Sequence, residues 1–244
     1  MIGIEKNSEL LKLVEGKTIA IVGPAPYLKQ KGRGLEFDSH DLIARPNEII
    51  PPKMIREDYG NRTDLFFCNF GTYWMPGIKR KILKNDNEEH FKKVKLVIGS
   101  AIKAKHSDFD YLSWPDNYIS DVPRNFHSIN KYNLPFYWIG VRDYKKLYSL
   151  ANAELNTGIA SILILLNYPI KKITVAGFTF YHGGQKYDEL YCEGHMDEID
   201  TKGRSFGHGG RANTQQIKLL KNLLSHYGDK IEIDETMKKI LKEY

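Results

Sequence analysis

Cysteine is scarce in this chain, and long hydrophobic runs are absent. Two cysteines in 244 residues exclude a disulfide scaffold and a four-cysteine zinc module. The longest apolar stretch, around Ile159 to Leu166, is far shorter than the ~20 residues that cross a bilayer. Residues 1–16 carry charges throughout and lack the apolar core of a signal peptide. We therefore expect a globular cytoplasmic protein without a transmembrane segment.

Charge of one sign is not strongly in excess. The 36 basic and 30 acidic side chains leave a net charge of +6, which ordinary solubility explains. The lysines are scattered, with no basic stripe interleaved with aromatics, so nucleic acid is not expected as a partner. Near the end of the chain, Lys230, Lys238, Lys239 and Lys242 indicate either peripheral contact with an anionic membrane or a solvated helix face.

Short apolar runs alternate with helical patterns along the chain. We expect buried strands at 18–23, 41–45, 64–68, 93–100, 173–177 and 230–233. Helices are expected at 8–14, 159–167 and 215–227, followed by a charged helical tail. The alternation predicts the α/β class, a Rossmann-like and mostly parallel sheet flanked by helices. One domain is expected over 1–244, with a small aromatic-rich helical insertion or lid at about 105–150.

A glycine turn follows the first expected strand. It reads Gly23-Pro24-Ala25-Pro26-Tyr27, and a turn between strand and helix can direct backbone N–H groups at a phosphate. The turn is not Gly-x-Gly-x-x-Gly and lacks a Gly-Lys-Ser/Thr sequence, so neither a dinucleotide site nor a P-loop is indicated. A tight turn without a ligand remains an alternative.

Three segments, in order along the chain, resemble the sialyltransferases. Residues 38–47 read Asp-Ser-His-Asp-Leu-Ile-Ala-Arg-Pro-Asn and, with Ile21-Val22-Gly23, resemble the large sialylmotif. Asn156-Thr157-Gly158, an apolar helix and then residues 175–181 resemble the small sialylmotif and the matching bacterial segment. Gly207-His208, followed by Asn213-Thr214, is similar to the segment holding the bacterial family's catalytic base.

The resemblance implies a variant GT-A fold and a metal-independent glycosyltransferase without a cofactor. Such an enzyme transfers a 2-keto acid sugar, sialic acid or a relative such as Kdo, from a CMP-sugar donor to a hydroxyl of a glycan or glycolipid. A monophosphate leaving group can be stabilised by hydrogen bonds, where diphosphate donors usually recruit a metal. Direct displacement would invert the anomeric centre.

The resemblance also implies the roles of particular residues. His208 would be the general base, because histidine titrates near neutrality, with His182 and His195 as rivals in the same long polar loop. Tyr181 and Tyr187 would stabilise the leaving phosphate, or else only pack that loop. Thr157 would cap its helix, bind the donor carboxylate, or do both. The donor-binding set is Gly23, Pro24, Ala25, Asn47, Asn69, Thr157, Gly158, Gly177 and Phe178.

The sequence departs from the family at two points. Pro24 stands where the family commonly has Asn, so one donor contact is lost or remade, and Cys68 and Cys192 do not fall at the positions of the animal enzymes' cysteine pair. A nucleotide-sugar hydrolase, a transferase with another donor, and a catalytically inactive nucleotide- or glycan-binding module are therefore alternatives. Without a signal anchor, a bacterial or viral type of enzyme is preferred over a Golgi one.

Other patterns are discounted. Asp108 and Asp110 form an Asp-x-Asp that can hold a divalent ion, but it lies outside the three segments. A zinc site would need unusual ligand spacings; its candidates are His182, Cys192, His195, Asp197 and His208. Tryptophan side chains could stack on an acceptor sugar, but packing is their commoner use. We expect packing for Trp74, Trp114 and Trp138.

Overall fold

The protein is built on one parallel sheet. The computed structural model describes residues 2–47, 51–70, 89–100, 115–116, 121–180 and 211–244. In this part of the chain, seven strands lie in the order β5-β4-β3-β2-β1-β6-β7. All neighbours pair in parallel, which confirms the predicted fold class. The strands are β1 (Thr18–Val22), β2 (Leu42–Pro46), β3 (Leu65–Cys68), β4 (Leu96–Gly99), β5 (Phe136–Trp138), β6 (Lys172–Ala176) and β7 (Ile231–Ile233).

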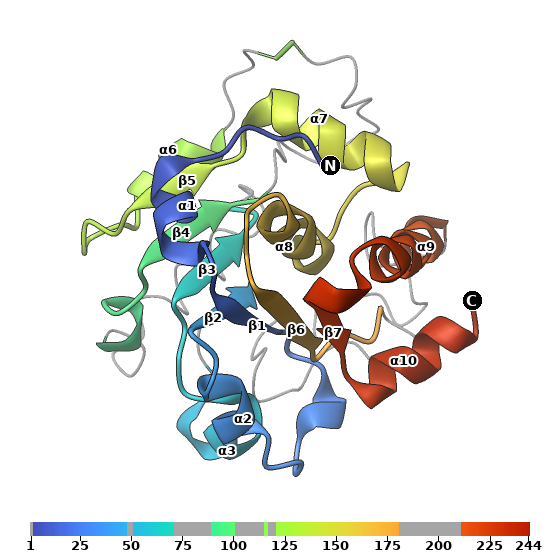
Figure 1. Cartoon of the computed structure of the whole chain (residues 1–244). Coiled ribbons are helices and arrows are strands. Elements are labelled where there is room, and N and C mark those ends of the chain that lie inside the picture. The colour runs from blue at the N-terminus through green and yellow to red at the C-terminus, as the bar shows by residue number, and fades with distance from the viewer. Residues whose placement is uncertain (1, 48–50, 71–88, 101–114, 117–120, 181–210) are drawn as a thin grey trace.

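Helices cover both faces of the sheet (Figure 1). The helices are α1 (Ser8–Val14), α2 (Gly34–Asp38), α3 (Arg56–Tyr59), α6 (Asp121–His127), α7 (Gly140–Ala151), α8 (Thr157–Leu166), α9 (Arg211–His226) and α10 (Glu235–Lys242). Short 3₁₀ turns add η1 (Pro26–Leu28), η2 (Lys53–Ile55) and η6 (Gly228–Lys230). Because both faces are covered, the strands read as continuous apolar runs rather than as alternating ones.

Successive residues of β1 serve different cores. Ile19 and Ile21 belong to the large core that includes α1, α7, α8, α9 and α10. Ala20 and Val22 face the other side, in the core with α2 and α3. This period of two is the geometry of a strand, in which neighbouring side chains point to opposite faces.

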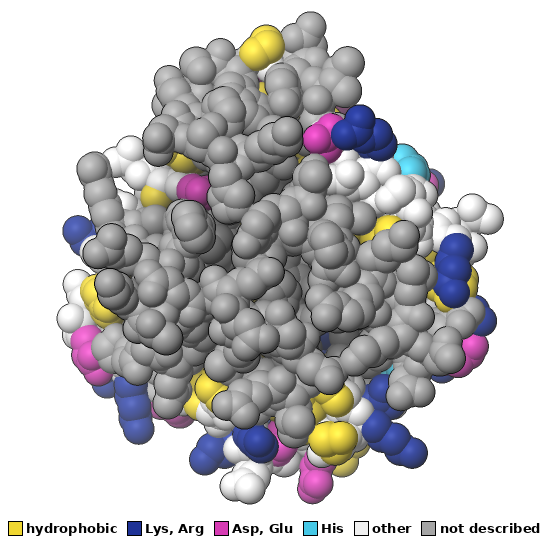
Figure 2. Space-filling view, turned by 180° about the vertical axis from the view of Figure 1, so that it is seen from behind, with side chains coloured by type: hydrophobic (Ala, Val, Ile, Leu, Met, Phe, Trp, Pro, Cys, Tyr) yellow, Lys and Arg dark blue, Asp and Glu magenta, His cyan; other side chains and the backbone are white. Residues whose placement is uncertain are grey.

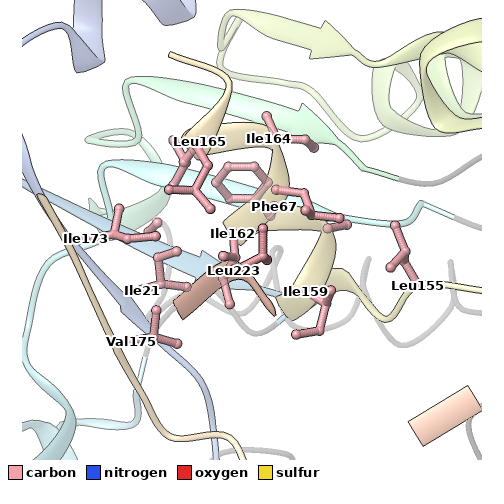
Figure 3. Packing of buried hydrophobic residues seen from close by; sticks show 14 of the residues in the cluster. Ile21, Phe67, Leu155, Ile159, Ile162, Ile164, Leu165, Ile173, Val175 and Leu223 are labelled. Carbon is pink, nitrogen blue, oxygen red and sulfur yellow. The ribbon is translucent and has the colours of Figure 1, made fainter. Parts of the chain in front are cut away.

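Helix α8 is the centre of the large core. All its residues from Thr157 to Leu166 are buried, as expected of a helix that is apolar all round. Figure 3 shows its isoleucine and leucine side chains among Ile21, Phe67, Ile173 and Val175 of the sheet. The helix that leads towards β6 is therefore fixed against the middle strands.

Only part of the expected helical insertion at 105–150 lies in the described residues, and that part joins the main fold. Within its described second half, β5 pairs with β4 in the main sheet, and α7 places Val141, Tyr144 and Leu147 in the large core. Aromatic residues fill the opposite face, where Phe126 of α6 stacks on Phe136 with ring centroids 4.4 Å apart. The aromatic residues reflect packing beside a short edge strand. Residues 105–114 and 117–120 lie outside the described part.

The C-terminal helix is part of the core. Met237, Ile240 and Leu241 of α10 are buried with α8 and α9, whereas Lys238 is exposed and pairs with Glu235 at 2.7 Å. The apolar face of α10 is already covered, so its lysines form a solvated face. Within the described residues, no helix combines the length and the apolar character needed to cross a membrane.

Candidate functional site: the switch point of the sheet

Four of the segments singled out from the sequence meet at the carboxyl edge of the sheet. Gly23 follows β1 and Gly177 follows β6, and these two strands are neighbours. The chain order runs outward from β1 to β5 on one side and from β6 to β7 on the other. In open α/β sheets, ligands bind at the carboxyl ends of strands where the order reverses in this way. Gly23 and Gly177 therefore occupy the switch point.

The backbones of Gly23 and Gly177 touch. Gly23 N–H donates to Ala176 O at 2.8 Å, and Ala25 N–H donates to Gly177 O at 3.1 Å. A Cβ on Gly23 would lie 2.4 Å from Gly177 O, and one on Gly177 would lie 2.2 Å from Gly23 O. Gly177 also has φ +82°, which side chains rarely tolerate. Each position requires glycine because the other backbone occupies the space of its side chain.

This crossing engages the N–H groups of Gly23 and Ala25 in the first turn. Gly23 and Ala25 donate theirs to the β6 turn, and Pro24 has none. Gly177 N–H and Phe178 N–H both donate to the Tyr27 hydroxyl oxygen, at 2.7 and 3.2 Å. The sequence of the glycine turn had suggested that it directs free N–H groups at a phosphate. In the structure, the N–H groups of Gly23 and Ala25 are instead bonded to the turn after β6.

Phe178 lies against the start of α8. A Cβ on Gly158 would come within 2.1 Å of Phe178 Cε1, and one on Gly23 within 3.1 Å of its Cζ. Gly158 is therefore small because the Phe178 ring takes the space beside it. The ring joins the β1 turn, the β6 turn and the N-terminus of α8 in one contact.

Asn47 and Thr157 join the two halves of the predicted site. The Thr157 hydroxyl donates to Asn47 Oδ1 at 3.0 Å, across 110 residues of sequence. Asn47 has φ +61° and its N–H donates to Phe67 O at 2.7 Å, so the left-handed bend after β2 turns the residue towards α8. Thr157 is buried, with 6% of its surface exposed.

The cap of α8 is Asn156. Its Oδ1 accepts from Ile159 N–H at 2.8 Å. Thr157 is therefore not the cap but the first residue inside the helix. The N–H of Asn156 donates to Oε1 of the fully buried Gln216 on α9, at 2.9 Å. Among the described residues, no hydrogen bond engages Thr157 N–H or Gly158 N–H, so the positive end of α8 keeps donors for an anion.

The remaining predicted site residues are placed as follows. Asn69 follows β3, which β2 separates from β1, so it lies further along the same edge. Tyr181, Tyr187 and His208 lie outside the described residues, as do His182, Cys192, His195 and Asp197 and both Asp108 and Asp110. In the described part of the chain, no group of three or more His, Cys, Asp or Glu side chains is arranged to hold a metal. Trp138 packs between two cores.

Several residues whose hydrogen-bond partners lie far away in the sequence were not predicted. Tyr27 donates to Asp234 Oδ2 at 2.5 Å and accepts from the β6 turn, and Tyr59 donates to Ala25 O at 2.8 Å. Gln216 anchors α9 beside α8. Tyr27 belongs to the glycine turn and Gln216 begins the expected helix at 215–227, but only tertiary structure reveals their partners. A polar residue in the middle of an apolar face, such as Gln216, is the one signal the sequence offered.

A parallel sheet with glycine turns at its switch point is an architecture found in nucleotide-binding α/β proteins. A family model described as glycosyltransferase family 29 (sialyltransferase) matches residues 6–223. The chain therefore belongs to this family and is a glycosyltransferase of the sialyltransferase class. A comparison with curated proteins gave no match.

Solved sialyltransferases share the fold. A mammalian sialyltransferase is 14% identical with a TM-score of 0.54, over 93% of this chain and 76% of that one. The sialyltransferase CstII from Campylobacter jejuni, in complex with CMP-3FNeuAc, is 15% identical with a TM-score of 0.54, over 91% of this chain and 88% of that one. The same protein with cytidine-5'-monophosphate is 17% identical with a TM-score of 0.52, over 90% and 80%.

The glycine crossing makes a prediction about stability. Gly177→Ala should lower the free energy of unfolding by about 3 kcal/mol or more, because it adds a backbone overlap to the strain of a positive φ. Gly16→Ala is the matched control, since Gly16 has φ +67° with nothing within 4 Å of its Cβ position and should lose about 1 kcal/mol. Urea unfolding measures both. Equal losses would mean that the crossing is not as tight as described.

Proposed function

We propose that this protein transfers a 2-keto acid sugar, sialic acid or a relative such as Kdo, from a CMP-sugar to a hydroxyl of a glycan or glycolipid. The observation that carries the proposal is the Thr157–Asn47 hydrogen bond, which joins the two sialylmotif-like halves at the switch point. Family membership supports the reaction class. CstII was solved with cytidine-5'-monophosphate, which supports a CMP donor here.

In this proposal the donor's anionic groups lie at the N-terminus of α8. Thr157 N–H and Gly158 N–H face the position where the helix dipole favours negative charge, and the Asn47–Thr157 pair lies beside them. The first turn, with its N–H groups engaged, would contact the nucleoside through backbone carbonyls of Gly23, Pro24 and Ala25 or by shape. Asn69, Gly177 and Phe178 complete the proposed donor set, Phe178 through its ring.

The proposed chemistry is an inverting displacement without a metal. His208 takes the proton of the acceptor hydroxyl as its oxygen forms a bond to the anomeric carbon. The bond from that carbon to the phosphate oxygen breaks, and CMP leaves with the electron pair. Tyr181 and Tyr187 donate hydrogen bonds to the departing phosphate, a task for which a monophosphate needs no divalent ion. Attack from the face opposite the leaving group inverts the anomeric configuration.

Two alternatives are tested by the same experiments. Pro24 removes the donor contact of the family's Asn, which favours another donor, a hydrolase, or an inactive nucleotide- or glycan-binding module. The proposal stands on the retention of Tyr181, Tyr187 and His208 in the sequence, because an inactive pocket has no chemical reason to keep all three.

Selective CMP binding is the first expected result. Calorimetry and thermal shift with CMP, CDP, UDP and GDP should show stabilisation by CMP alone, unchanged by EDTA, because hydrogen bonds rather than a metal hold the phosphate. Tighter binding of a diphosphate nucleotide with metal would overturn the donor assignment. No binding of any of the four would favour the inactive module.

Loss of the proposed base should separate binding from catalysis. His208→Ala should lower turnover by at least ~10² while CMP affinity stays within about threefold, since the base acts on the acceptor. His195→Ala, in the same loop sequence, is the control and should retain activity. Transfer assays with CMP-sialic acid and CMP-Kdo measure both variants. Wild-type turnover in His208→Ala would refute the assignment.

We also propose that this cytoplasmic enzyme contacts the membrane surface through the surface of α2 and η2. Leu35 and Met54 are 86% and 74% exposed, and Gly34, beside Leu35, packs on the carbonyl of Arg56. Lys53 is exposed in η2, and Lys29 and Lys31 are exposed in the turn that precedes α2. In Figure 2, hydrophobic side chains lie among Lys and Arg and also Asp and Glu side chains along the lower margin, at the height of α2 and α3 in Figure 1. Exposed apolar side chains among lysines suit an anionic bilayer.

Vesicle sedimentation tests this contact. The chain should bind phosphatidylcholine vesicles that contain phosphatidylglycerol and not those without it, and Leu35→Ser with Met54→Ser should lower binding about tenfold. Leu150→Ser, at a 48% exposed position of α7, is the control. Equal binding by both variants would refute the surface.

A further inference from the structure

The Tyr27 hydroxyl is the centre of a buried hydrogen-bond network next to the switch point. Its oxygen accepts from Gly177 N–H at 2.7 Å and from Phe178 N–H at 3.2 Å, and its proton goes to Asp234 Oδ2 at 2.5 Å. One hydroxyl therefore uses its donor and both of its acceptor positions. Burial first, and then the Asp234 carboxylate, raise the pKa of the Tyr27 hydroxyl well above its ordinary value.

Asp234 links this network to the C-terminal helix. Its Oδ1 caps α10 by accepting from Met237 N–H at 2.8 Å, while its Oδ2 faces Tyr27. The side chain is 5% exposed, and Arg33 Nη1 lies 3.9 Å from Oδ2. One oxygen of the carboxylate therefore caps α10, and the other faces the Tyr27 hydroxyl and the Arg33 guanidinium. These contacts fix the orientation of the carboxylate.

The network holds the Gly177–Phe178 segment, the part of the site whose conformation is most constrained. Gly177 has a positive φ and precedes the Gly177–Phe178 peptide, whose oxygen, Gly177 O, accepts from Ala25 N–H of the first turn. The Phe178 ring is wedged between Gly158 and Gly23. A rotation of that one peptide would move the ring, the first turn and the wall beside the α8 N-terminus together.

We propose that Tyr27 and Asp234 are positioning residues for the donor: they hold the Gly177–Phe178 peptide in the orientation that shapes the donor pocket, and they couple that pocket to α10. The proposal rests on the proposed function, since the pocket is taken to bind CMP. Neither side chain is assigned a contact with the donor. Both act through Gly177 and Phe178.

Paired tyrosine variants test the proposal. Tyr27→Phe removes the acceptor of two N–H groups. It should weaken CMP binding by about tenfold, which corresponds to the free energy of about one hydrogen bond. Tyr168→Phe is the matched control, because the Tyr168 hydroxyl is also buried and accepts a backbone N–H, that of Asn7 at 2.9 Å, in the N-terminal segment. Both variants should lose similar thermal stability, but only Tyr27→Phe should raise the KM for the donor, with kcat changed less than threefold.

An isosteric change at Asp234 separates the cap from the contact with Tyr27. Asparagine is as good a helix cap as aspartate, and in Asp234→Asn the cap requires the amide oxygen, which leaves the NH₂ group facing Tyr27. This variant should keep the thermal stability of α10 and still weaken CMP binding several-fold. If its affinity equals that of the wild type, the Asp234 part of the proposal is wrong.

Amide hydrogen exchange tests the hydrogen-bond network itself, without CMP. The amides of Gly177 and Phe178 should exchange at least tenfold faster in Tyr27→Phe and at the wild-type rate in Tyr168→Phe. CMP binding unchanged in Tyr27→Phe would show a purely structural network and overturn the proposal. If the wild type itself fails to bind CMP, the proposed function falls, and the positioning role for a donor falls with it; faster amide exchange in Tyr27→Phe would then show only that the network exists.

Discussion

The contact between the backbones of Gly23 and Gly177 is the constraint on which the site depends. Two neighbouring parallel strands end in turns that would collide if either carried a side chain. By approaching so closely, the turns exchange hydrogen bonds and draw Phe178 onto the first turn of α8. Asn47, Thr157 and the α8 N-terminus are then held around one point. The small residues along this edge are small because something else fills their space.

This arrangement separates two tasks that a phosphate-binding loop usually combines. In a P-loop, the glycine turn itself supplies the N–H groups. Here the first turn gives its N–H groups to β6, and the free donors are at the N-terminus of a different helix, one capped by Asn156. The glycine turn packs against Phe178 and the turn after β6, and the N-terminus of α8 keeps the free N–H donors. A proline in the first turn is compatible with that division, since no N–H is needed there.

Much of the architecture could be read from the sequence. The β-branched runs that end at Gly23, Gly99 and Gly177 gave strands at nearly the predicted positions, because short apolar segments between turn residues form buried strands. The strand at Phe136–Trp138 was not predicted, because three aromatic residues after a proline carry no clear period. The helix from Gly140 lies in the segment expected to be helical, but its boundaries were not predicted. At the site, resemblance pointed to Asn47 and Thr157, which the fold brings together. Tyr27, Gln216 and Asp234 were not recognised, since their partners are 150, 60 and 57 residues away.

The pairing of β1 with β6 has a consequence for how the protein folds. Strand β1 pairs on one side with β2, close in sequence, and on the other with β6, which starts at Lys172. Closing so long a loop carries a large entropic cost before any contact repays it, so such pairings form slowly. During synthesis the N-terminal strands can assemble first, but the edge of β1 that pairs with β6 stays open until β6 emerges. The switch point between β1 and β6 therefore belongs to the last stage of folding, and until then the exposed edge of β1 is a place where chaperones and other chains compete for the nascent protein.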